Sequence, residues 1–121
     1  MKLDELVATS LAIGATPSRL AKAARLCTCL EALQADEVAI AVAWLCGDLP
    51  QGKIGLGPAI VRSARPAVHA DLPTLTIDDV HRVFDRIQAT TGSGSQGERA
   101  RLLTALLAAA TLPAAAQADF P

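Results

Sequence analysis

Apolar residues recur at three- and four-residue intervals in short runs along this chain, and a glycine or a proline follows almost every run. Such spacing places the apolar side chains on one face of a helix. Alanine and leucine dominate the apolar residues, whereas β-branched residues are few and tyrosine is absent, and this mixture favours helix over sheet. The sequence therefore predicts an all-α fold, an irregular bundle of about six helices that forms a single domain over residues 1–121.

Local signals place the expected helix boundaries. We expect helices near residues 3–14, 18–33, 36–46, 57–65, 76–89 and 95–111. Thr16 is expected to cap the second helix and Asp36 the third, and Ser95 with Glu98 has the spacing of a capping box for the sixth. The third helix is apolar on nearly all sides, so it is predicted to be the central buried helix.

Charge and cysteine content limit the possible partners. The net charge is −1, so a nucleic-acid site would have to be a local patch. The chain has no apolar stretch long enough for a bilayer and no signal-peptide layout, which predicts a cytoplasmic protein without a membrane partner. Cys27 and Cys46 are expected in the core as reduced thiols, and the cysteine spacing gives a zinc site little support.

A glycine-serine turn before the sixth helix is the most informative segment for function. Its glycines allow backbone angles that aim successive amides at one point, and the following helix start adds free N–H groups. Such a turn can hold a phosphate. The residues concerned are Gly92, Ser93, Gly94, Ser95 and Gln96, with Arg99 in the next turn of the helix. The alternative, which spacing alone favours, is a solvated turn capped by Ser95.

Basic residues at three-residue steps form a second candidate site on the second helix. Arg19, Lys22 and Arg25 share one face of that helix. A face of this kind is more often solvated than bound to a ligand.

Several segments in order carry a resemblance to a known family. They are Ala15–Lys22 (ATPSRLAK), Trp44–Pro50 (WLCGDLP), Gly52–Gly57 (GKIGLG), Thr91–Gln96 (TGSGSQ) and Arg101–Leu107 (RLLTALL). Together they resemble the N-terminal DNA-binding domain of ATP-dependent DNA ligases, particularly the compact bacterial branch. The resemblance extends from about Leu3 to Thr111.

This resemblance implies a helical module that clamps nicked duplex DNA across the minor groove, mostly through phosphates and sugars. Carried over to this chain, the turn from Gly92 to Gln96 would grip DNA phosphates with Arg99 close behind. Arg19 and Lys22 would lie on the same DNA-facing side. Phosphate contacts suit a protein that must accept any sequence. The implied processes are DNA repair, recombination and replication.

The chain also departs from that family. Ligases attack ATP with a lysine in a Lys-x-Asp-Gly motif, whereas Lys2, Lys22 and Lys53 stand in other contexts. We therefore expect no nick sealing and no cofactor in this chain, although the full-length family uses ATP and Mg. The implied partners are nicked duplex DNA and the missing catalytic domains of the ligase. Family members continue beyond the sixth helix, so we expect the domain to be incomplete at its C-terminal end.

A second hypothesis is a small helical protein-interaction domain without nucleic-acid binding. The slightly acidic balance supports it, as do alanine faces on the sixth helix that we expect to be exposed, such as Ala105, Ala108 and Ala109.

Overall fold

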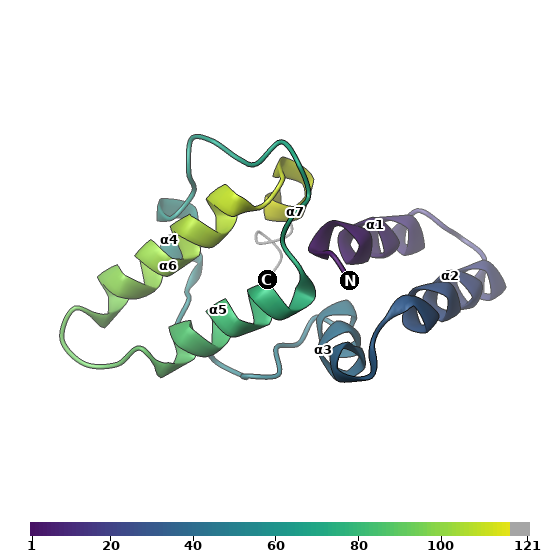
Figure 1. Cartoon of the computed structure of the whole chain (residues 1–121), viewed down its shortest axis with the longest axis horizontal. Coiled ribbons are helices and arrows are strands. Elements are labelled where there is room, and N and C mark those ends of the chain that lie inside the picture. Colours follow the sequence, from purple (N-terminus) through teal and green to yellow (C-terminus); the bar gives the residue numbers. More distant parts are fainter. Residues whose placement is uncertain (117–121) are drawn as a thin grey trace.

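The structure, a computed structural model, describes residues 1–116, and the secondary structure within them is all-α, as predicted (Figure 1). The helices are α1 (Leu3–Gly14), α2 (Arg19–Ala32), α3 (Ala35–Leu45), α4 (Pro58–Ser63), α5 (Ile77–Ala89), α6 (Ser95–Ala109) and α7 (Leu112–Ala116). The sequence pattern missed only the short α7. The expected end of the domain at Pro121 lies outside the described residues. Within those residues, no helix combines the length and apolar character needed to cross a membrane.

The helices form two groups along the long axis of the molecule (Figure 1). At one end α1 packs on α2, and at the other α6 packs on both α5 and α4. Contacts of α3 with α5 and of α1 with α7 join the two groups. The Trp44 and Phe84 rings meet in a T-shaped arrangement across the α3–α5 contact, with ring centroids 6.0 Å apart.

Helix α5 supplies the central part of the core. Its first residue, Ile77, is fully buried in a cluster with Leu6 of α1, and Ile87 is fully buried in a second cluster with Leu102 of α6. The predicted start of α5 is confirmed, because Thr76 forms a capping box with Asp79. The predicted leucine face of α6 is confirmed as well, and its buried members are Leu102, Leu103, Leu106 and Leu107.

The chain N-terminus lies inside the packing between α3 and α5. The ammonium group of Met1 forms an ion pair with Glu37 of α3, and both groups are almost fully buried. The Met1 carbonyl accepts a hydrogen bond of 2.9 Å from the Ile77 amide. The Glu37 carboxylate also accepts one of 2.9 Å from the Gln34 amide. The ammonium group and this amide hold the pKa of Glu37 below its ordinary value.

Two expected helix caps are wrong. Ser18, not Thr16, caps α2 by accepting a 3.3 Å hydrogen bond from the Ala21 amide. The Thr16 hydroxyl is already committed, because it donates to the Ala12 carbonyl at the end of α1. Helix α3 begins after Gln34 rather than at Asp36, because the Glu37 carboxylate reaches back to the Gln34 amide.

The predicted central position of α3 is also wrong. Within the described residues, only Glu37 and Ala41 of this helix are buried, and 41% of the Val42 side chain is exposed. Its largest helix contact is with α5, and Ala41 also packs in one core cluster with Leu6 of α1 and Cys29 of α2. These contacts cover one side of α3 and leave Val42 exposed, so an apolar composition on nearly all sides did not make it the central buried helix.

The cysteine prediction fails for a related reason. Cys27 and Cys46 are exposed, whereas Cys29 is buried. Helix α2 packs mainly on α1, and that contact covers the face that carries Cys29. The face that carries Cys27 and Leu20 is left outside, and Leu20 is 85% exposed. Cys46 lies at the exposed C-cap of α3.

Candidate nucleic-acid interface

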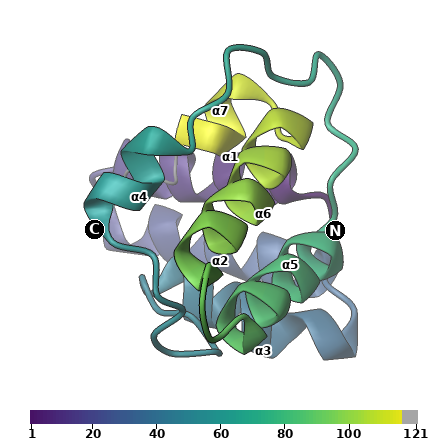
Figure 2. The same ribbon diagram turned by 90° about the vertical axis from the view of Figure 1, so that its left-hand side faces the viewer.

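The glycine-serine turn lies between α5 and α6, at the end of the molecule that faces the viewer in Figure 2. Gly92 and Gly94 adopt left-handed backbone angles, with φ of +91° and +78°. Residues 91–94 are exposed, and no atom lies within 4 Å of where a Cβ would stand on either glycine. The turn therefore needs glycine for its backbone conformation rather than for space.

The expected capping box of Ser95 and Glu98 is wrong. Gly94 takes the N-cap position, and Ser95 becomes the first residue of α6. The Glu98 side chain instead accepts two hydrogen bonds from Arg101, of 2.9 and 2.5 Å. These bonds hold the pKa of Glu98 below its ordinary value. The negative charge of Glu98, near the start of α6, is thus balanced by the positive charge of Arg101.

The turn leaves a series of backbone donors without an internal acceptor. The Ser95 amide donates to the Gly92 carbonyl, and the Glu98 amide donates to the Gly94 carbonyl, both at 3.2 Å. Among residues 1–116, no acceptor is found for the amides of Thr91, Gly92, Ser93, Gly94, Gln96 and Gly97. These donors lie at the positive end of the α6 dipole, which is an arrangement suited to an anion.

Arg99 reaches from α6 to two separate segments of the chain. Its Nη2 atom donates a 2.6 Å hydrogen bond to the Thr90 carbonyl, at the start of the turn. Its guanidinium also lies against Gly55, where a Cβ would come within 2.7 Å of Nη1. The structure thus brings the Gly52–Gly57 loop beside the turn. Sequence reasoning missed this contact, for which the glycine at position 55 was the only signal.

The Gly52–Gly57 loop is anchored to the same helix pair. Ile54 is buried against Ile87 of α5 and Leu102 of α6. Just before the loop, the Gln51 side-chain amide donates to Asp85 of α5 at 2.8 Å. Both glycine-containing segments therefore rest on a scaffold of α5 and α6.

The basic face of α2 lies far from the turn. Arg19 is the first residue of α2, and α2 occupies the opposite end of the long axis from the turn (Figure 1). Arg19 is exposed, and Lys22 is partly buried one turn later. A ligand that contacts both the turn and this face would have to run along the molecule.

Proteins named probable DNA ligase match almost the whole chain. The protein of that name from Anaeromyxobacter dehalogenans (strain 2CP-1) is 48% identical over 115 residues, which cover 93% of this chain and 22% of the relative. The one from Anaeromyxobacter sp. (strain Fw109-5) is 48% identical over 112 residues, 92% of this chain and 22% of the relative. The one from Mycolicibacterium gilvum is 46% identical over 111 residues, 92% of this chain and 21% of the relative.

This chain is a homologue of part of those DNA ligases. It spans about a fifth of the length of the curated relatives that it matches. No family profile matches the chain, and no solved structure does.

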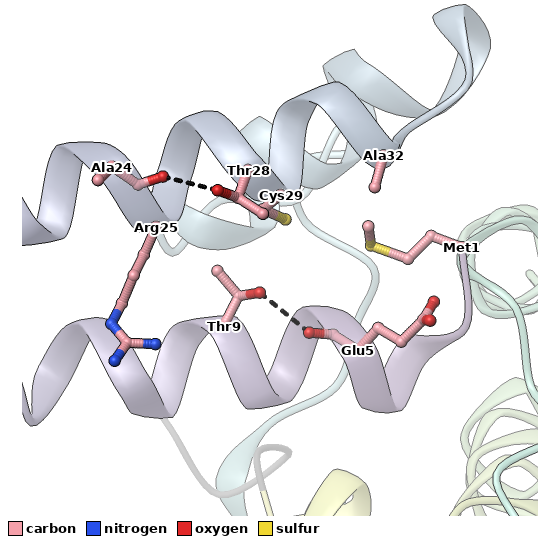
Figure 3. A pocket seen from close by; sticks show the side chains of 8 residues that line it. All are labelled: Met1, Glu5, Thr9, Ala24, Arg25, Thr28, Cys29 and Ala32. Carbon is pink, nitrogen blue, oxygen red and sulfur yellow. Dashed lines mark hydrogen bonds between the residues drawn. The ribbon is translucent and has the colours of Figure 1, made fainter.

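The chain also has a groove of about 400 Å³ between α1 and α2 (Figure 3). The Arg25 side chain extends from α2 toward α1, and Glu5 lies in the first turn of α1. The Thr9 and Thr28 hydroxyls in this groove already donate to carbonyls of their own helices, each at 3.1 Å. The groove therefore offers a ligand fewer uncommitted donors than the turn does. Residues 1–116 contain no cluster of acidic, histidine and cysteine side chains suited to a metal ion.

Proposed function

We propose that this chain is the N-terminal DNA-binding module of an ATP-dependent DNA ligase and that it binds nicked duplex DNA without regard to sequence. The observation that carries the proposal is the row of amides without acceptors at the start of α6. The near-complete match to proteins named probable DNA ligase supports DNA as the anion. In this reading the module acts in the cytoplasm, in DNA repair, recombination and replication.

The chemistry of the turn explains why binding would be independent of sequence. Amide donors from residues 91–94, 96 and 97 match phosphate oxygens, which are the same at every nucleotide. The side chains of Ser93, Ser95 and Gln96 would add hydrogen bonds to the same phosphates. Arg19 and Lys22 would contact the backbone further along the duplex, because α2, which carries them, occupies the other end of the long axis. We propose that ATP and Mg act in the catalytic domains that such a ligase carries elsewhere.

A titration with nicked duplex DNA at several salt concentrations tests the proposal. If three phosphates are contacted, log affinity should fall with log salt at a slope of about −3, at about 0.9 per contact. The variant Ser93→Glu places a carboxylate in the turn and should weaken binding about tenfold at low salt, for every DNA sequence alike.

The matched control is Ala105→Glu, which makes the same charge change at an exposed position further along α6. It should bind like the unaltered protein. Absence of binding at low salt, or an equal loss in the two variants, would show that the turn is not a phosphate site.

A protein-interaction domain is the second candidate, and the exposed apolar face of α2 favours it. Leu20 on that face is 85% exposed and Cys27 is exposed as well. Self-association in sedimentation experiments that is insensitive to salt, together with no affinity for DNA, would support this candidate over the first.

A further inference from the structure

The Arg99 side chain packs against neighbouring backbone segments rather than extending into solvent. The Nη2 atom donates to the Thr90 carbonyl at 2.6 Å. The Nε atom is buried and has no hydrogen-bond partner within the described residues. An arginine that contacts a phosphate with its guanidinium edge presents such donors to solvent. Here one of the two N–H groups of Nη2 is used by Thr90 and the Nε donor is covered.

The absence of a side chain at Gly55 is what makes room for the guanidinium. A Cβ at this position would lie 2.7 Å from Nη1 and 2.8 Å from Cζ of Arg99. The φ of Gly55 is +77°, so another residue would also strain the backbone. The flat guanidinium group fits against this backbone, whereas the ammonium of a lysine has no plane to place there.

The two segments that Arg99 touches have few internal restraints of their own. Each contains two glycines in the left-handed conformation, Gly52 and Gly55 in the loop and Gly92 and Gly94 in the turn. One backbone hydrogen bond, from the Ser95 amide to the Gly92 carbonyl, closes the turn. Buried Ile54 anchors the loop to α5 and α6, and Arg99 adds a contact that joins the loop to the turn.

We propose that Arg99 is a positioning residue, which fixes the Gly52–Gly57 loop and the Thr90–Gly94 turn in one arrangement that receives the DNA backbone. The inference rests on the proposed function for its ligand. It assigns Arg99 a role different from that of a phosphate contact. The guanidinium orients the amides of the turn, and those amides bind the phosphate.

Two variants disturb this contact from opposite sides. Arg99→Lys keeps the positive charge but loses the planar group, and Gly55→Ala keeps Arg99 but pushes it away. In the free protein, amide NMR signals of Gly92, Ser93 and Gly94 should shift in both variants, although Gly55 belongs to a different segment. Arg82→Lys is the matched control, because Arg82 lies in the first half of α5 and its side chain is 75% exposed.

DNA affinity separates the positioning role from direct contact. Each variant should weaken binding of nicked duplex about tenfold, the equivalent of one charge-assisted hydrogen bond, and the double variant should be no weaker than the worse single variant. Arg82→Lys should bind normally. If Arg99→Lys binds like the unaltered protein, or if the two losses add, Arg99 contacts phosphate by its charge and the proposal is overturned.

The measurements also separate this inference from the proposed function. NMR shifts that link Gly55 to the turn, in a protein with no affinity for DNA, would overturn the proposed function and with it the DNA role of Arg99. DNA binding without such shifts would overturn the positioning role alone. If Gly55→Ala does not fold, as judged by circular dichroism, Arg99→Lys and Arg99→Gln decide the question by the same two readouts.

Discussion

Replacing Glu37 by glutamine should destabilise the fold more than any other single charge change in the described part of the chain. The carboxylate is buried and pairs with the ammonium group of Met1. It also accepts the hydrogen bond from the Gln34 amide that starts α3. Glutamine has nearly the same shape but no charge, so Glu37→Gln leaves a buried ammonium without its counter-ion.

The size of the effect follows from this burial. Removing one partner of a buried ion pair costs about 3–5 kcal/mol, because the remaining charge loses its compensation. A domain of this size has a free energy of unfolding of roughly 5–15 kcal/mol, so the loss is a large part of the total. With a shift of about 4 °C in Tm per kcal/mol, the variant should melt roughly 12–20 °C below the unaltered protein.

Urea unfolding followed by circular dichroism, repeated between pH 3 and pH 7, measures this cost. The pKa of Glu37 is lowered in the folded state from its ordinary value of 4.5. The stabilisation by Glu37 is therefore fully present above that value and is lost as the pH falls through the lower, folded-state pKa. The difference between Glu37→Gln and the unaltered protein should be largest near pH 7 and should shrink toward pH 3.

Glu31→Gln provides the control, because Glu31 is an exposed glutamate on α2. Its free energy of unfolding should change by less than about 0.5 kcal/mol. If Glu37→Gln costs no more than Glu31→Gln at pH 7, or if its cost does not change with pH, the buried pair does not stabilise the fold as argued.

Three further substitutions or reactions test other parts of the structure. A thiol reagent should label Cys27 and Cys46 rapidly in the native protein and Cys29 only on unfolding; rapid reaction of all three would contradict the packing of α2 on α1. Thr76→Ala should lower the free energy of unfolding by about 1 kcal/mol in a urea titration, because α5 loses its cap, and no change would show that the cap is not needed. Leu103→Ala, at a side chain that is 3% exposed, should cost about 2–5 kcal/mol in the same assay, whereas a cost below 1 kcal/mol would place Leu103 outside the core.

Local signals predicted α5 and the buried face of α6 correctly. At the start of α5, the capping threonine and the apolar residues Ile77, Val80 and Ile87 all indicate the same helix and the same buried face. Where the capping residue and the apolar periodicity indicate the same helix, the tertiary contacts stabilise the helix that the local sequence favours. The glycine content of the turn likewise indicated left-handed backbone angles, which Gly92 and Gly94 adopt.

Prediction failed where two local solutions were nearly equivalent. Ser95 with Glu98 and Gly94 alone are both acceptable starts for α6, and the bond between Glu98 and Arg101 favours the second. On α2, small apolar residues occur on more than one face, so periodicity could not say whether Cys27 or Cys29 faces the core. The contact with α1 made that choice.

For the candidate site as well, the sequence predicted the local features and not the contacts between distant segments. The sequence indicated the turn, because the conformational freedom of its glycines and the helix that follows it are properties of neighbouring residues. It did not indicate that Arg99 contacts Gly55, or that α2 lies at the other end of the molecule.

By itself the sequence determined the helices, most of their boundaries and the glycine-serine turn, since helical periodicity, capping and glycine conformation depend on residues within about four positions of each other. Only the tertiary structure decided which helix faces are buried, where the N-terminus packs and which loop lies beside the turn. These features depend on contacts between residues far apart in the chain, and many such pairings satisfy the same local pattern. The packing of whole helices against one another selects among them.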